Sequence, residues 1–123
     1  MNNNVRTQYL NRVELAGFVG SARRTEVQGR TLVSFTVATN FARVIRGERI
    51  VETTWWNVSA WEGKGVPQDV VNGIAKGAKI HLIGRLRNNS YTGADGVVRT
   101  AGEVLASTVE LLDRESLMAY QTS

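Results

Sequence analysis

Five segments of this chain alternate between apolar and polar side chains, and that pattern restricts the fold more than any other feature. The segments span residues 11–20, 31–39, 53–61, 79–87 and 103–112. Successive side chains of a β-strand point to opposite faces, so each segment is predicted to be a strand with one buried face. The chain is therefore expected to be mainly β.

One segment with helical spacing lies between the third and fourth predicted strands. Pro67, the only proline, suits the first turn of a helix, where its missing N–H removes no hydrogen bond. Gly77 is expected to end this helix in a C-cap position. A short apolar stripe lies between Pro67 and Gly77 and is made of Val70, Val71, Ile74 and Ala75.

This order of strands, with a helix after the third, predicts a five-stranded OB-fold barrel, an all-β fold with one short helix. Another small β-barrel is an alternative, because periodicity does not determine how a sheet closes. The length of 123 residues suits one domain. We expect that domain at residues 11–112, a flexible N-terminal arm at 1–10 and a short C-terminal tail at 113–123.

The connections between strands are predicted to be hairpins. Residues 21–30 are polar and join the first two strands. Residues 40–51 are expected to form a long basic hairpin loop with its tip at Gly47 and Glu48. Residues 88–99 are expected to form a second extended hairpin.

The composition excludes several kinds of site. The chain has no cysteine and a single histidine, His81, so a disulfide, a thiolate metal site or a catalytic triad is not expected. The carboxylates show no spacing for acid/base work and the glycines form no phosphate loop, so no catalytic residue, metal or cofactor is predicted. No apolar run approaches the roughly 18 residues of a membrane span, and the N-terminus lacks the apolar core of a signal peptide.

All three tryptophans fall within one predicted strand, at positions 55, 56 and 61. Strand alternation places Trp55 and Trp61 on the face that also carries Asn57 and Ser59, whereas Trp56 shares the opposite, apolar face. Trp56 is therefore interpreted as a core or subunit-interface residue. Trp55 and Trp61 are interpreted as exposed platforms on which unpaired bases could stack.

Basic residues gather in the two long hairpins and are interleaved with an aromatic residue in each. The net charge of +4 and the pI of about 10 favour polyanionic partners. A basic groove lined by flat rings suits single strands, whereas duplex readers more often offer a basic helix. Scattered surface charge is the alternative for any single arginine. The candidate residues are Phe41, Arg43, Arg46 and Arg49 in the first hairpin and Arg85, Arg87, Tyr91 and Arg99 in the second.

Four segments resemble a known family. They are residues 11–17 (Asn-Arg-Val-Glu-Leu-Ala-Gly), 33–39 (Val-Ser-Phe-Thr-Val-Ala-Thr), 54–61 (Thr-Trp-Trp-Asn-Val-Ser-Ala-Trp) and 77–86 (Gly-Ala-Lys-Ile-His-Leu-Ile-Gly-Arg-Leu). In this order and spacing they are similar to the bacterial single-stranded DNA-binding protein family. The resemblance implies an OB-fold that coats single-stranded DNA in replication, recombination or repair, without catalysis. It also implies a homotetramer, with a dimer as the alternative, in the cytoplasm and associated with the nucleoid.

The resemblance also indicates where bases would stack and where this chain departs from the family. The family's aromatic positions match Trp55, Trp61 and Tyr91, but a further one falls on Arg43, with Phe41 two residues earlier. The family's acidic tip, which recruits replication and repair proteins, has no counterpart in residues 113–123, so no particular protein partner is implied. The alternative is a primosomal-type OB-fold module that bridges DNA to a helicase or loader.

Overall fold

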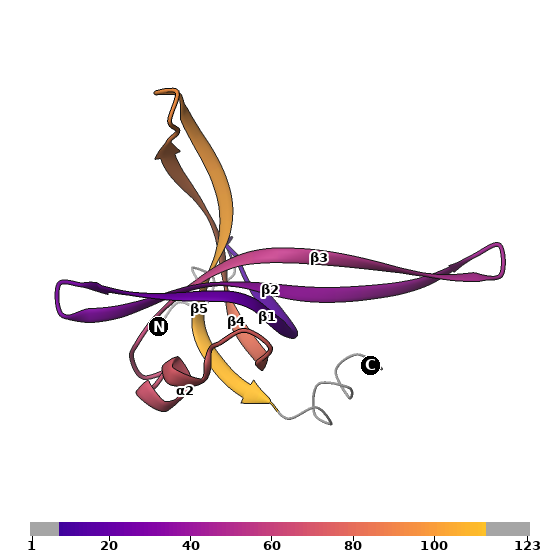
Figure 1. The fold of residues 1–123 in the computed structure, drawn as a ribbon, viewed down its shortest axis with the longest axis horizontal. Coiled ribbons are helices and arrows are strands. Elements are labelled where there is room, and N and C mark those ends of the chain that lie inside the picture. Colours follow the sequence, from indigo (N-terminus) through magenta and orange to yellow (C-terminus); the bar gives the residue numbers. More distant parts are fainter. Residues whose placement is uncertain (1–7, 113–123) are drawn as a thin grey trace.

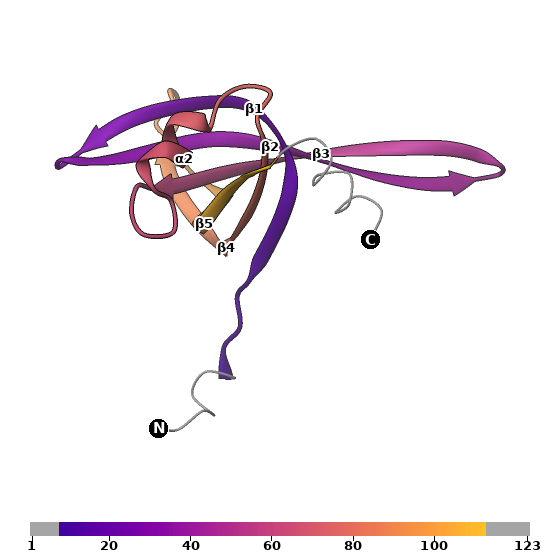
Figure 2. The same ribbon diagram turned by 90° about the horizontal axis from the view of Figure 1, so that it is seen from below.

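The computed structural model describes residues 8–112, which form a closed five-stranded barrel with one short helix (Figure 1, Figure 2). The predictions for residues 1–7 of the arm and for the tail at 113–123 lie outside this described part. The elements are β1 (Val13–Val27), β2 (Arg30–Ile45), β3 (Glu48–Trp61), α2 (Gln68–Gly73), β4 (Lys79–Thr92) and β5 (Val98–Leu112).

The barrel closes in the strand order β1-β2-β3-β5-β4, and β4 pairs back with β1. All neighbours are antiparallel except β3 and β5, which run parallel. The connection between these two elements carries α2 and β4, so the helix follows the third strand. The predicted five-stranded OB-fold barrel with one short helix is therefore confirmed.

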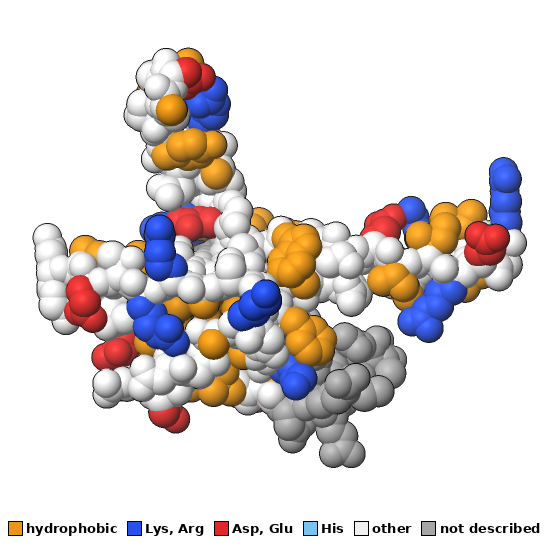
Figure 3. All heavy atoms as spheres, in the orientation of Figure 1, with side chains coloured by type: hydrophobic (Ala, Val, Ile, Leu, Met, Phe, Trp, Pro, Cys, Tyr) orange, Lys and Arg blue, Asp and Glu red, His pale blue; other side chains and the backbone are white. Residues whose placement is uncertain are grey.

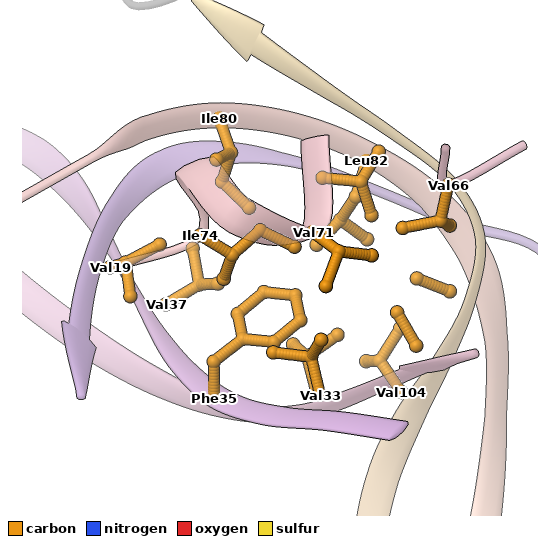
Figure 4. Close-up of a cluster of buried hydrophobic side chains, with 14 residues drawn as sticks. Val19, Val33, Phe35, Val37, Val66, Val71, Ile74, Ile80, Leu82 and Val104 are labelled. Atoms are coloured by element: carbon orange, nitrogen blue, oxygen red, sulfur yellow. The ribbon is translucent and has the colours of Figure 1, made fainter. Parts of the chain in front are cut away.

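The core forms from the inward faces of the strands and from α2 (Figure 4). Along β2, Val33, Phe35 and Val37 are buried, as the alternation predicts. Val71 of α2 and Ile74 directly after it are also buried and point into the barrel. The other buried apolar residues are Val19, Val58, Ala60, Val66, Ile80, Leu82, Val104, Ala106 and Val109.

The strands extend much further into the hairpins than the sequence predicts. β2 and β3 remain paired until Ile45 lies opposite Glu48, so residues 40–51 form a two-stranded ribbon and not a loop. The tip is at Arg46 and Gly47, whose φ angles are 52° and 80°, and not at Gly47 and Glu48. Two consecutive left-handed residues form a hairpin turn whose twist matches that of the strands, so pairing continues up to the turn.

The β1–β2 hairpin repeats this design. Gln28 and Gly29 have φ angles of 51° and 79°, and the pairing runs up to Val27 opposite Arg30. Figure 1 shows this hairpin and the β2–β3 ribbon extending from the barrel in opposite directions, while the β4–β5 hairpin projects separately. The two-residue turns thus make paired, two-stranded arms of the predicted loops, and these arms carry side chains away from the core.

Helix α2 ends earlier than predicted. Its last residue is Gly73, and Ile74 is already extended with φ −78° and ψ 96°, whereas Gly77 lies in the following turn with φ 88°. Arg24 of β1 donates from Nη2 to the carbonyl oxygens of Val71 (2.7 Å) and Ile74 (3.2 Å). The Arg24 guanidinium thus supplies hydrogen bonds to carbonyl oxygens at the end of the helix, so the helix ends here without a glycine cap.

The contact between Arg24 and the end of α2 gives a stability prediction. Arg24→Ala is expected to lower the free energy of unfolding by about 1–2 kcal/mol, because it removes charged hydrogen bonds to partly buried carbonyls. Urea denaturation measures the change. Arg23→Ala is the matched control. Arg23 is the preceding residue of β1 and is likewise exposed, but its side chain lines a surface groove with β2 and β3. Equal stability of the two variants would contradict this role of Arg24.

Candidate nucleic-acid interface

The three tryptophans of β3 divide between two faces of the barrel. Trp55 is 58% exposed and Trp61 is half-buried, and both lie on the outer face of the strand. Val58 and Ala60, of the opposite parity, are buried in the core. Trp56 shares their parity, packs against the core and donates from Nε1 to Thr39 Oγ1 at 2.9 Å. The predicted separation of Trp55 and Trp61 from Trp56 is therefore what the strand geometry shows.

Trp55 lies against a glycine of β1, on the far side of β2. A Cβ added to Gly20 of β1 would come within 2.3 Å of Cζ3 of the Trp55 ring. The ring can therefore approach β1 this closely only because position 20 has no side chain. The sequence pattern does not predict this role of Gly20, because its contact with Trp55 depends on strand pairing.

The β4–β5 hairpin presents its candidate residues on this same outer face. Leu105 of β5 lies opposite Ser59, which shares the face of Trp55 and Trp61. On β4, Arg85 lies opposite Leu105 and therefore also points outward. The same alternation along the two strands places Arg87, Tyr91 and Arg99 on the outer face. Tyr91 is half exposed. Arg85, Arg87, Tyr91 and Arg99 thus share the outward parity of Trp55 and Trp61, and Arg85 lines one pocket together with Trp61.

The β2–β3 ribbon divides its candidates between its two faces. Arg49 lies opposite Val44 and has the parity of Trp55, so it extends the outer face. Phe41 and Arg43 have the other parity, that of Trp56, and point to the opposite side of the ribbon. Arg46 is at the turn. Phe41 and Arg43 are therefore not brought together with Trp55.

The candidate arginines also differ in their ion pairing. Arg43 pairs with Glu52, Arg87 Nε lies 2.6 Å from Glu103 Oε1, and Arg99 Nη2 lies 2.5 Å from Asp95 Oδ2. Among residues 8–112, no carboxylate pairs with the other three, Arg46, Arg49 and Arg85. These three side chains therefore have the most positive charge to offer an anion.

In the β4–β5 hairpin, Asp95 of the Arg99–Asp95 ion pair also accepts a hydrogen bond from the backbone of the turn. The hydrogen bond from Arg99 lowers the pKa of Asp95, and the backbone N–H of Val97 acts in the same direction. Asp95 therefore stays ionised, and the pair intact, down to a lower pH than an isolated aspartate would allow.

Two basic residues that the sequence analysis did not select lie on the outer face. The Arg30 guanidinium sits 4.8 Å from the centroid of the Trp61 ring, within the range of a cation–π contact. Arg23 lines a groove across β1, β2 and β3. Residues 21–30 were predicted to be a connection and not part of two strands. Extending the strand alternation through them is the signal that would have put Arg30 on the outer face.

This groove is the polar middle of the outer face. Hydroxyl, amide and charged side chains line it, and it lies between the two tryptophans of that face. Its polar lining residues are Ser21, Arg23, Ser34, Thr36, Asn57, Ser59 and Glu103, and Ala22, Phe35 and Val58 complete the lining. In the space-filling view, apolar and basic side chains are interspersed over the barrel and its arms (Figure 3). Such a surface can stack flat rings and neutralise phosphates along one path.

Other kinds of site are not found in the described part of the chain. Among residues 8–112, no group of three or more His, Cys, Asp or Glu side chains is placed to hold a metal ion. No helix in this range is long and apolar enough to cross a membrane.

A closed barrel in the strand order β1-β2-β3-β5-β4, with one helix between β3 and β4, is an OB-fold. The chain belongs to the single-strand binding protein family, whose model matches residues 10–112.

Named relatives agree with this assignment, and a solved structure shares the fold. The single-stranded DNA-binding protein of Neisseria meningitidis serogroup A is 32% identical over 108 residues, which cover 84% of this chain and 60% of that protein. The protein of the same name from Xanthomonas axonopodis pv. citri is 28% identical over 105 residues, covering 84% and 58%. This chain thus spans about 60% of the length of these relatives. A structure described as Plasmodium falciparum SSB complex with ssDNA shares the fold, with a TM-score of 0.70, 22% identity and coverage of 85% of this chain and 97% of that one.

Proposed function

We propose that this chain binds and coats single-stranded DNA without strong sequence preference. The observation that carries the proposal is the outer face of the barrel, which bears Trp55, Trp61 and Arg85 and which the two hairpins extend with Arg49 and Tyr91. Family membership and the names of the relatives support it. The processes served are replication, recombination or repair in the cytoplasm, and the chain acts by binding and not by catalysis.

Bases would stack on Trp55, Trp61 and Tyr91, while Arg49 and Arg85 contact phosphates nearby. Base–aromatic stacking is tolerant of sequence, because every base has a π-face. Duplex binding is disfavoured, because α2 has six residues and no basic residue in its last turn. A strand that lies on Trp55 reaches Phe41 and Arg43 only by passing around the edge of the β2–β3 ribbon.

We also propose that the chain acts as a homo-oligomer, a tetramer as in its family or a dimer. Residues 13–16 of β1 pair with β4 along one edge, and no described strand pairs with their other edge. Glu14 and His81 lie on the outer side there, joined by a 2.6 Å hydrogen bond that lowers the pKa of Glu14. A free strand edge beside this hydrogen-bonded pair suits pairing with a second copy.

Titration with dT oligomers of increasing length tests both proposals. Tryptophan fluorescence is expected to fall as bases stack on the exposed rings, and affinity is expected to fall steeply with salt. Light scattering of the same samples gives the mass of the free protein and of each complex. Unchanged fluorescence with no complex at any length would refute DNA binding, and a mass of one chain would refute the oligomer.

The primosomal-type interaction module is the second candidate. The ribbon exposes apolar side chains, with Phe41 67% and Val44 71% exposed, and such residues suit a protein partner. In that case the chain would capture a helicase or loader while binding oligonucleotides weakly. Strong binding of dT oligomers without capture of a helicase or loader favours the coating of single-stranded DNA over the interaction module.

A further inference from the structure

A carboxylate stands in the middle of the proposed DNA-binding face. Glu103 of β5 has a side chain that is 12% exposed. It lines the polar groove across β1, β2 and β3 and also the cleft next to Trp55, where β3 and β5 separate. A negative charge at the centre of a surface for a polyanion requires an explanation.

Two hydrogen bonds from neighbouring strands hold this carboxylate. Arg87 of β4 donates from Nε to Oε1 at 2.6 Å, and Ser59 of β3 donates from Oγ to Oε2 at 3.0 Å. Ser59 is itself buried, at 7% exposed. An ionised carboxylate has about four lone-pair sites. Each oxygen therefore keeps capacity for a further donor, in an orientation fixed by the two bonds already made.

The position selects which part of a bound strand can approach Glu103. Phosphate oxygens are repelled by the carboxylate and are acceptors only, so they offer it no hydrogen bond. A base stacked on Trp55 presents its edge to the adjoining cleft, whose lining includes Asn57 and Glu103. In a complex the carboxylate would therefore meet base edges, and the phosphates would pass nearer to the unpaired arginines.

We propose that Glu103 accepts a hydrogen bond from the exocyclic amino group of a bound base and so favours cytosine over thymine at this position. This inference rests on the proposed function. Cytosine presents N4–H donors, which a carboxylate accepts, whereas thymine presents the O4 acceptor in the same place. One such position among several stacking contacts gives a bias in base composition and leaves binding broadly sequence-tolerant.

The test compares oligomers of dT with oligomers of 5-methyl-dC, because the two bases share the methyl group and differ at position 4 and the adjoining N3. Affinities of both are measured for the wild type and for Glu103→Gln. Glutamine keeps the length of the side chain, accepts from Arg87 through its oxygen, and offers an N–H to thymine O4. The preference for 5-methyl-dC over dT is expected to fall by about three- to tenfold in Glu103→Gln.

Glu110→Gln is the matched control. It removes the same charge from the same strand, but Glu110 lies opposite His81, away from the groove and the cleft. The control is expected to keep the wild-type ratio of the two affinities. An equal change of the ratio in both variants would overturn the role of Glu103, since it would show an effect of charge alone.

The outcomes separate this inference from the proposed function. If both oligomers bind and Glu103→Gln keeps the wild-type ratio, Glu103 does not read bases, while DNA binding stands. If the wild type binds neither oligomer, the proposed function itself fails. If circular dichroism shows that Glu103→Gln does not fold, the affinities of the wild type for the two oligomers are the test. Equal affinity of the wild type for dT and 5-methyl-dC then overturns the inference.

Discussion

Replacing Trp55 and Trp61 together by alanine is expected to weaken binding of oligo-dT by about 2–6 kcal/mol, which is at least about thirtyfold in affinity. Each ring on the outer face offers a stacking platform, and two platforms separated by Asn57 and Ser59 would hold separate bases of one strand. Fluorescence anisotropy of a labelled oligomer measures the loss, because it does not depend on the tryptophans that are removed.

Folding is not expected to explain this loss. Trp55 is 58% exposed, and neither Trp55 nor Trp61 belongs to the core cluster or packs against it, so removing both rings opens no cavity in the core. Trp56→Phe is the matched control, since Trp56 packs against the core and bonds Thr39. That change is expected to lower the free energy of unfolding by about 1 kcal/mol while leaving DNA affinity near the wild-type value. Wild-type binding by the double alanine variant would refute stacking on β3.

The sequence predicted the barrel well because burial leaves a clear mark on alternation. Val33, Phe35 and Val37 must point inward, so the strands near the core and the separation of Trp55 from Trp56 follow from periodicity alone. Beyond the core, both faces of a ribbon meet solvent and the alternation loses its meaning. The ribbon over residues 40–51 was therefore mistaken for a loop, even though its strands are fully paired.

The same limit explains which parts of the site could not be predicted. Gathering Phe41 and Arg43 with Trp55 requires a flexible loop, whereas a paired ribbon fixes their parity and sends them to the other face. The early end of α2 depends on Arg24, a residue of a different strand. The setting of Glu103 depends on donors from two more strands, and no local pattern along β5 reveals them.

Salt dependence should distinguish the arginines that are free from those already paired. Arg46, Arg49 and Arg85 have no carboxylate partner among residues 8–112, so each can neutralise a phosphate without first losing an ion pair. Each phosphate contact on a single strand contributes about −0.7 to the slope of log affinity against log salt. Changing all three to glutamine is expected to make this slope less negative by about 2.

The matched control changes two paired arginines, Arg43 and Arg99, whose charges are already offset by Glu52 and Asp95. Its slope is expected to change by well under 1, because phosphate binding there would leave a carboxylate without its partner. The slopes come from titrations with one dT oligomer between 50 and 200 mM salt, an interval over which three phosphate contacts alter affinity by about twentyfold. An equal change of slope in the two variants would show that ion pairing within the protein does not determine which arginines meet the DNA.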